Sequence, residues 1–242
     1  MKKIKVEVSR NENGKEYIKV YEVPFQEKMR VLGAMKHIQE NLEGDLAFRW
    51  NCGEGICGSC AVELDGKPVL ACKTEISEDV KKIKLSPLKA FPVVKDFVFD
   101  RSKVDEQAAR IKPYFITDNK EKGFWKMDEG DIKDTVEMRT CIDCLICHDS
   151  CHVLKNTKLK FLGPRNIVKA NSLDTHPMNS LDRTKLVRDE GIANCNVSGC
   201  CTDNCPQEIK ITDNANIPMK ERSISEKDFL KSVLKKIKEG KW

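Results

Sequence analysis

The stretch "CGEGICGSCAVELDGKPVLAC", residues 52–72, joins three closely spaced cysteines to a hairpin that ends on a fourth cysteine. The spacing is Cys52-x4-Cys57-x2-Cys60, followed by Cys72. This is the plant-type spacing for a [2Fe–2S] cluster, in which the cysteine thiolates hold two irons. The glycines between the cysteines suit a tight loop, because glycine adopts backbone conformations that other residues avoid. A structural zinc site usually takes two close pairs of ligands instead. We therefore predict a [2Fe–2S] cluster on these four cysteines.

The segments on the amino-terminal side predict the fold that carries this loop. Residues 4–10, "IKVEVSR", and residues 17–24, "YIKVYEVP", alternate apolar and polar side chains around the turn signal "NENG". Residues 27–44 place apolar side chains at helical spacing and end on a glycine. A second hairpin turns at Asp65-Gly66. Two hairpins and one helix indicate an α+β domain of the β-grasp type, like that of plant-type ferredoxins.

The pattern changes in the second part of the chain. Residues 85–100 contain two prolines and indicate a connector. Beyond them, helices are predicted over residues 101–115, 135–155, 163–174 and 225–240. We therefore divide the chain into residues 1–99, a [2Fe–2S] domain with its connector, and residues 100–242, an all-α domain resembling bacterial ferredoxins.

Cysteine content is the most informative feature of the composition. The chain has 242 residues and 12 cysteines, which fall into three tight groups. In an intracellular protein such a content favours metal binding over disulfides. The charged fraction of 33% is typical of a soluble globular protein, and no apolar run reaches the ~20 residues of a membrane-spanning helix. A net charge of +5 without a nucleic-acid-binding module argues against a nucleic-acid partner. No signal sequence is evident, so we expect a cytoplasmic protein.

The second cysteine group is "CIDCLICHDSC", residues 141–151, with cysteines at x2, x2 and x3 spacing. In two-cluster bacterial ferredoxins the first three cysteines of such a run bind one cubane, and the fourth serves the other. The first cubane then needs one cysteine from a distant segment, and "NCNVSGCCTDNCP", residues 194–206, supplies it before a proline. Counting in this way predicts a [4Fe–4S] site on Cys141, Cys144, Cys147 and Cys205.

The remaining cysteines predict a third site. Cys151, Cys195 and Cys201 are left for it, with Cys200 unplaced. A complete cubane would have a cysteine at the x2 position after Cys195, and that residue is Ser198. Three thiolates suit a [3Fe–4S] cluster.

The four histidines are not needed as ligands. His148 and His152 lie inside the second cysteine group, where histidine can replace cysteine at iron–sulfur centres. The cysteines already suffice, so we expect neither histidine to bind iron. His37 and His176 are expected to be ordinary helix and surface residues.

One [2Fe–2S] motif in a β-grasp domain, followed by two interlocked cubane motifs in a helical domain, resembles the iron–sulfur subunit of succinate dehydrogenase and fumarate reductase. The resemblance covers nearly the whole chain. It extends to the first cluster loop (residues 46–74), the interdomain segment "VVKDFVFDRSKVDEQAARIKPYF" (93–115) and the connecting helix "FLGPRNIVKA" (161–170). The family spacing also selects Cys201 over Cys200. We expect Cys200 to be a packed thiol; the alternative is that it completes a second [4Fe–4S] cluster.

The resemblance implies a function. In this family a partner flavoprotein oxidises succinate or reduces fumarate at FAD, and the iron–sulfur subunit conducts single electrons through its three clusters. The second redox partner is usually a quinone, such as menaquinone, held by a membrane anchor. The chain would then lie peripherally on the cytoplasmic face of the membrane and would contain no catalytic residue.

Two departures from the family pattern leave the electron partner open. Many quinone-reactive members carry a proline and aromatic residues after the cysteine matching Cys151, whereas this chain has "HVLKNTK". Many also have a histidine where Asn196 stands. The partner is therefore a membrane subunit with a different quinone site or a soluble thiol-linked protein, as in a thiol-dependent fumarate reductase. A free polyferredoxin is a further alternative, although such proteins are usually small and acidic.

Overall fold

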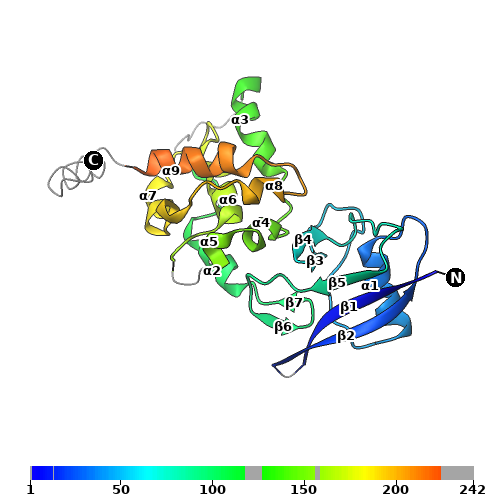
Figure 1. Ribbon diagram of the computed structural model, residues 1–242. Helices are drawn as coiled ribbons and strands as arrows, with labels where there is room; N and C mark the ends of the chain where they lie inside the picture. The colour runs from blue at the N-terminus through cyan, green and yellow to red at the C-terminus, as the bar shows by residue number, and fades with distance from the viewer. Residues whose placement is uncertain (1, 13, 118–126, 156–158, 225–242) are drawn as a thin grey trace, which may run out of the picture.

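The computed structural model describes residues 2–12, 14–117, 127–155 and 159–224 of the chain. They form a strand-rich lobe followed by a lobe of short helices, and the two lobes lie side by side (Figure 1). The last strand ends at Phe99 and the first helix of the second lobe begins at Ser102.

The first lobe is built on a five-stranded mixed sheet with strand order β2-β1-β5-β3-β4. Only β1 and β5 pair in parallel; the other neighbours are antiparallel. The strands are β1 (Lys3–Glu12), β2 (Lys15–Pro24), β3 (Ala61–Leu64), β4 (Lys67–Leu70) and β5 (Lys82–Ser86), and the helix is α1 (Val31–Asn41). Both predicted hairpins and the predicted helix are present, and the β-grasp prediction is confirmed.

The connector contains more structure than the sequence predicts. Strand β5 pairs with β1, which lies at the other end of the lobe's sequence, so no hairpin signal marks β5. Residues 93–99 form a small antiparallel pair, β6 (Val93–Lys95) and β7 (Val98–Phe99), where we expected a plain linker. Both elements depend on long-range pairing, which a local pattern does not reveal.

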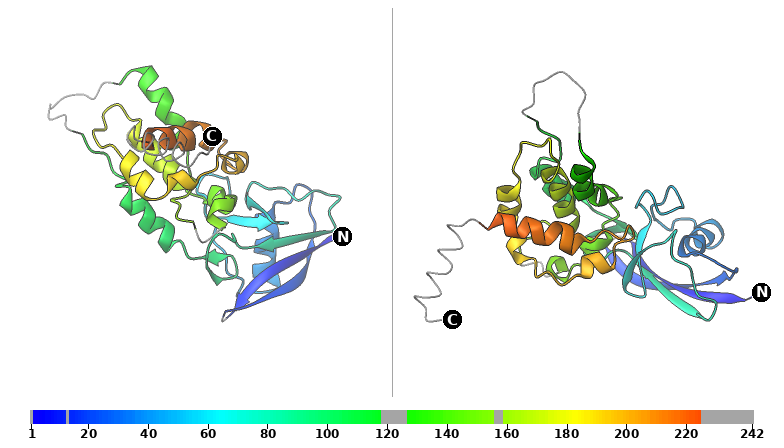
Figure 2. Two further views of the ribbon diagram at one scale, coloured as in Figure 1. Left: turned by 60° about the vertical axis from the view of Figure 1, so that its left-hand side comes forward. Right: turned by 90° about the horizontal axis from the view of Figure 1, so that it is seen from above.

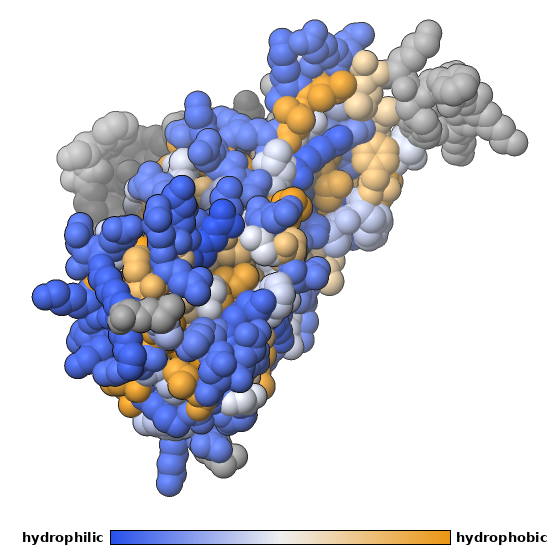
Figure 3. Space-filling view, turned by 90° about the vertical axis from the view of Figure 1, so that its right-hand side faces the viewer, coloured by the Kyte–Doolittle hydropathy of each residue, from blue (hydrophilic) through white to orange (hydrophobic). Residues whose placement is uncertain are grey.

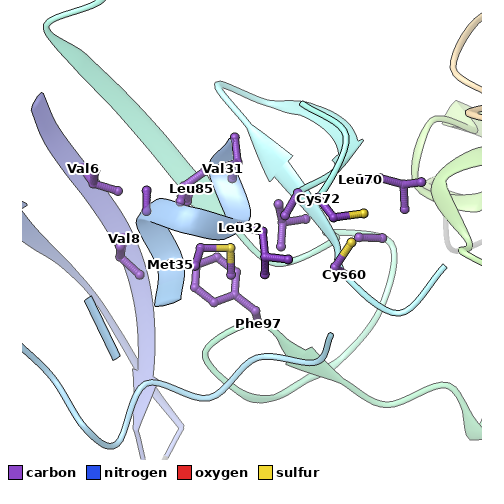
Figure 4. Packing of buried hydrophobic residues seen from close by; sticks show 14 of the residues in the cluster. Val6, Val8, Val31, Leu32, Met35, Cys60, Leu70, Cys72, Leu85 and Phe97 are labelled. Carbon is purple, nitrogen blue, oxygen red and sulfur yellow. The ribbon is translucent and has the colours of Figure 1, made fainter. Parts of the chain in front are cut away.

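The core of the first lobe lies between the sheet and α1. Val6 and Val8 point inward from β1, and Leu32 and Met35 pack against them from the helix (Figure 4). Cys60 and Cys72 belong to the same core and lie at its end, with their sulfurs pointing toward one another. The end of the core that carries the cysteine loop is therefore held by buried packing.

A buried guanidinium fixes the loops at the other end of the sheet. Arg10 of β1 is almost fully buried, and its Nε lies 2.8 Å from Oδ1 of the buried Asp96. It also contacts the Tyr21 hydroxyl at 3.1 Å and the Asp45 carboxylate at 3.0 Å. Asp96 in turn accepts the backbone N–H of Ala47 at 2.9 Å. This network connects the sheet to the segment that leads into the cysteine loop.

The second lobe consists of helices of at most 11 residues within the described part of the chain. These are α2 (Ser102–Arg110), α3 (Glu129–Arg139), α4 (Ile146–Asp149), α5 (His152–Lys155), α6 (Pro164–Asp174), α7 (Thr184–Asp189), the 3₁₀ turn η1 (Ile192–Asn194), α8 (Cys200–Asp203), the π-helical turn η2 (Thr212–Asn216) and α9 (Ile217–Ser223). Figure 2 shows that β1 and β2 lie at the end of the molecule remote from these helices.

The predicted helix over residues 135–155 is wrong as a continuous element. Helix α3 ends at Arg139, and the chain turns before α4 with positive φ at Asp143 (55°) and Leu145 (66°). Closely spaced cysteines that face one group require this turn, because a straight helix would point them in different directions. The predicted helix at 163–174 is present as α6, and the prediction for 225–240 lies outside the described residues.

The two lobes share buried contacts. Leu145 and Ile146 at the start of α4 belong to the core of the first lobe. The backbone N–H of Ala90 donates to Asp149 Oδ1 at 2.9 Å, and Asp149 also meets the buried Glu63 of β3. Burial and the neighbouring Glu63 carboxylate raise the pKa of Asp149 to about 6. The junction is a packed interface in which the Asp149 carboxyl is buried beside Glu63.

The surface is mainly polar. Viewed from the first lobe, hydrophilic side chains dominate and apolar ones are scattered between them (Figure 3). Among the described residues, no helix is both long and apolar enough to cross a membrane.

We predict that Asp96→Asn destabilises the protein by about 3–5 kcal/mol, because it removes the fully buried carboxylate beside the Arg10 charge and leaves only the partly exposed Asp45 and Glu43. The matched control is Glu22→Gln, which removes the exposed carboxylate that lies 3.1 Å from Lys3. Its effect should stay below about 1 kcal/mol. Urea unfolding followed by circular dichroism measures both. Equal effects of the two substitutions would contradict the role assigned to the Arg10 network.

Candidate iron–sulfur sites

The first site is a loop in which backbone amides converge on one sulfur. The N–H groups of Glu54, Ile56 and Cys57 each lie 3.4 Å from Cys52 Sγ. The glycines at 53, 55 and 58 all have positive φ, which turns these amides inward. Such a ring of donors stabilises a thiolate. Cys52 and Cys57 are half-buried, whereas Cys60 and Cys72 are buried.

The thiols of this loop differ in their proton affinity. Partial burial acts to raise the pKa of Cys57, but hydrogen bonds from Cys52 and Ser59 outweigh it and lower the value to about 6. Burial raises the pKa of Cys60 to about 12. The exposed side of the loop thus favours a thiolate, while the core side needs a compensating positive charge to hold one.

The second site is a cavity in the helical lobe closed from two distant segments. Its cysteines are Cys141 and Cys144 from the turn between α3 and α4, Cys147 of α4, and Cys205, which follows α8. The remaining lining includes Arg165 and several aliphatic side chains. The structure therefore brings together all four cysteines that the spacing predicts for the [4Fe–4S] site.

The third site is a neighbouring cavity lined by Cys151, Cys195 and Cys201. Cys200 and Ser198, the two candidates for a further ligand, also line it, and they lie 3.4 Å apart. Cys201 Sγ is 3.4 Å from the Thr212 hydroxyl and accepts a hydrogen bond from Asn216 Nδ2 at 3.6 Å. Within the described residues, no charged side chain lines this cavity.

The donor sets of both cavities fit an iron–sulfur cluster better than a single ion. No three His, Cys, Asp or Glu side chains among the described residues converge closely enough to hold one metal ion. Burial raises the pKa of Cys144 to about 12 and that of Cys151 to about 11. Buried thiolates are stable only when cations compensate them. Several irons, each bound by one of the thiolates around a cavity, would supply that charge.

The first loop touches the second cavity directly. The Gln207 side chain donates to the Gly55 carbonyl at 3.1 Å. Gly58 lies so close to the second cysteine run that a Cβ there would come within 2.3 Å of the Ile142 carbonyl oxygen. The second and third cavities are also neighbours, because Cys147 of the second and Cys151 and Cys201 of the third belong to one buried cluster. The second cavity is therefore in contact with both other sites.

The histidines lie at the edges of these sites. Buried His148 stacks on Phe91. Its Nδ1 is 3.9 Å from Cys147 Sγ and accepts the backbone N–H of Arg165 at 3.4 Å. His152 is exposed, with Nδ1 3.9 Å from Cys200 Sγ. His37 contacts Asn41 on α1, and His176 packs edge-on against Phe115.

Two family models match this architecture. The model for a 2Fe-2S iron-sulfur cluster binding domain matches residues 3–106, and the model for a 4Fe-4S dicluster domain matches residues 137–209. The first covers the strand-rich lobe and the second covers the cysteines of both cavities.

Known relatives extend the match to nearly full length. The fumarate reductase iron-sulfur subunit of Haemophilus influenzae is 30% identical over 235 residues, covering 90% of each chain. That of Escherichia coli O157:H7 is 30% identical over 97% of this chain and 98% of its own. The chain belongs to the family of succinate dehydrogenase and fumarate reductase iron–sulfur subunits. A solved structure titled "Mycobacterium smegmatis Sdh1 complex in the apo form" contains a chain with a TM-score of 0.86 and 38% identity, covering 91% of this chain and 95% of that one.

Another relative is much longer than this chain. It is a subunit of the CoM/CoB fumarate reductase of Methanothermobacter marburgensis, and it is 33% identical over 88% of this chain. This chain spans only 42% of that relative's length.

The two departures from the family pattern meet in space. Asn196 stands where many quinone-reactive members have histidine, and its side-chain nitrogen lies 2.6 Å from His152 Nε2. His152 itself stands directly after Cys151, where those members have proline. The third cavity of this iron–sulfur subunit therefore has a polar contact at its edge, beside the exposed Val197.

Several residues of the sites gave no signal in the sequence. Arg165 lines the second cavity. Gly58 of the first loop lies against the second cysteine run, and Gln207 donates a hydrogen bond to that loop. Their roles arise from segments that meet only in the folded chain. Gly58 alone offers a hint, as one of three glycines in the loop.

We predict that Gly58→Ala disrupts the second site, because the new methyl group would overlap the Ile142 carbonyl and crowd Cys144. Gly53→Ala is the matched control: its φ of 73° imposes the same backbone strain, but nothing lies within 4 Å of the new Cβ. Gly53→Ala should lose about 1–2 kcal/mol, and Gly58→Ala should lose more, because its new methyl group also meets backbone atoms of residues 142 and 144. Only Gly58→Ala should also lower the iron content and the four-iron signal in electron paramagnetic resonance (EPR). Loss of that signal in both variants would argue against a specific contact.

Proposed function

We propose that this chain conducts single electrons between the FAD of a partner flavoprotein and a second redox partner, in a complex that interconverts succinate and fumarate. The observation that carries the proposal is the serial arrangement of three cysteine sites. The cysteine loop touches the second cavity through Gly58 and Gln207, and the second cavity adjoins the third. A chain of adjoining one-electron sites is what electron transfer between two partners requires.

The proposed ligands follow the cysteine groups of the sequence. Cys52, Cys57, Cys60 and Cys72 hold a [2Fe–2S] cluster, and Cys141, Cys144, Cys147 and Cys205 hold a [4Fe–4S] cluster. Cys151, Cys195 and Cys201 hold a [3Fe–4S] cluster, with Cys200 as a non-ligand thiol. Residues 1–99 and 100–242 are the corresponding domains. Bound clusters of these types exchange one electron at a time.

The protein residues hold the thiolates, donate hydrogen bonds to them and exclude water. The amides of Glu54, Ile56 and Cys57 point at Cys52, and Asn216 and Thr212 contact Cys201. Hydrogen bonds to cluster sulfurs and burial are the means by which a protein sets reduction potentials. This role needs no general acid or base from the chain.

The two outer sites reach the surface. The first loop exposes Ile56, whose accessible fraction is 66%, beside the half-buried Cys52 and Cys57. This apolar side chain suits contact with the flavoprotein. At the other end, Asn196 and Ser198 are exposed at the mouth of the third cavity. We place the second redox partner there.

The second partner is a quinone or menaquinone in a membrane anchor, which would place the chain on the cytoplasmic face of the membrane. A second candidate is a non-quinone partner, as in a thiol-dependent fumarate reductase. The polar contact between His152 and Asn196 at the third cavity favours this candidate, because the aromatic residues of many quinone-reactive members are missing.

The test is purification of the tagged full-length chain from its own host. We expect a stoichiometric FAD-containing subunit to co-purify, and succinate to reduce the clusters of that complex. Purification without any flavoprotein would contradict the proposal and favour a free polyferredoxin. Assays of the intact complex with a menaquinone analogue and with thiols then distinguish the two electron partners.

We predict that Cys205→Ser removes the four-iron EPR signal and leaves the [2Fe–2S] absorption spectrum intact, because the first site draws all its ligands from residues 52–72. Cys200→Ala serves as the matched substitution in the same segment and should leave an oxidised three-iron signal unchanged. Conversion of the third site from a four-iron to a three-iron signal by Cys200→Ala would instead make Cys200 a ligand.

A further inference from the structure

Arg165 is a buried cation at the wall of the second cavity. It is the second residue of α6, and its side chain is only 4% exposed. Within the described residues, it is the only charged side chain that lines either the second or the third cavity. The remaining lining of the second cavity consists of cysteines, apolar side chains and one glutamine.

The carboxylate partners of Arg165 are partly exposed. Its Nε donates to Asp143 Oδ1 at 2.6 Å, and its Nη1 lies 3.9 Å from Asp105 Oδ1. These two carboxylates are 44% and 49% exposed, so water screens their charge far more than that of the guanidinium. Asp143 also faces the site, because its Oδ1 lies 4.0 Å from Cys141 Sγ. The third partner, Asn166 Oδ1, is neutral and accepts from Nη1 at 2.7 Å. Arg165 and Asp143 therefore act on the site with opposite signs, and water screens the guanidinium less than the carboxylate.

Contacts connect Arg165 to the cysteines of the site. Its backbone N–H donates to Nδ1 of the buried His148 at 3.4 Å, and this Nδ1 lies 3.9 Å from Cys147 Sγ. Because Nδ1 accepts that hydrogen bond, His148 adds no second cation to the wall. Lys169 is more remote, with its Nζ 4.0 Å from the outer Asp143 carboxylate.

We propose that Arg165 raises the reduction potential of the group bound by Cys141, Cys144, Cys147 and Cys205, relative to the same site without a buried cation. This inference rests on the proposed function. Reduction adds one electron, and thus one negative charge, to a water-poor cavity; the electron comes from the adjoining site, and Arg165 stays protonated throughout. A fixed positive charge at the wall stabilises the reduced form more than the oxidised form. Arg165 thus acts through its charge and makes the group in the second cavity easier to reduce.

The experiment is an EPR-monitored redox titration of the cluster-loaded complex. Arg165→Gln removes the charge and should shift the midpoint potential of the four-iron site downward. Asp143→Asn removes the opposing carboxylate but keeps an acceptor for Arg165, and should shift the same potential upward. The matched control is Arg110→Gln, which removes an equal charge from a 57% exposed side chain outside the cavity lining. It should leave the potential unchanged, and the [2Fe–2S] potential should stay constant in every variant.

The outcomes separate the two proposals. Opposite shifts in Arg165→Gln and Asp143→Asn support the inference. An intact four-iron signal with an unchanged potential in both variants overturns it and leaves the ligand assignment standing. If Arg165→Gln fails to bind the cluster, Asp143→Asn decides alone, and a downward or absent shift overturns the inference. Absence of a four-iron signal from the loaded wild-type complex would contradict the ligand assignment itself.

Discussion

The structure depends on one electrostatic constraint: thiolate charge must be stable in places that water does not reach. Burial raises the pKa of Cys144 and Cys151 well above that of a free thiol, so their anions need compensation. Tight turns bring the sulfurs together, backbone amides and Asn216 supply hydrogen bonds, and Arg165 supplies a fixed charge. The shortness of the helices around the cavities follows from the same constraint, because a long straight helix would point neighbouring cysteines apart.

Each lobe uses a buried guanidinium to fix the loops around this arrangement. Arg10 holds the segments before and after the cysteine loop through Asp96 and Asp45. Arg183, which is fully buried, donates to the backbone carbonyls of residues 111, 112 and 114. Irregular backbone has carbonyl groups without regular partners, and arginine carries enough donors to satisfy several of them at once. Arg10 thereby supports the segments that flank the first cysteine loop, and Arg183 supports the irregular segment that follows α2.

Local patterns in the sequence predicted the features that local patterns control. The hairpins, α1 and α6 follow from alternation, periodicity and the proline at residue 164. The cysteines that spacing assigns to each site line one cavity each, and Cys200 also lines the third. The interruption of the helix between α3 and α4 was not predicted, because the apolar spacing around Cys144 also suits a helix. Strand β5, the Glu63–Asp149 pair and the place of Arg165 could not be predicted, since each depends on segments far apart in the chain.

The interleaving of the second and third cavities has a consequence for biosynthesis. The first loop is complete once the ribosome has made residue 72, and all its cysteines belong to one folding lobe. The other two cavities share their walls: residues 141–151 supply one side of each, and residues 195–205 supply the other. The linings continue to Ile211 in the second cavity and to Asn216 in the third, so neither is complete until these residues have been made. The thiols of the first loop are therefore available before the other two linings can be completed.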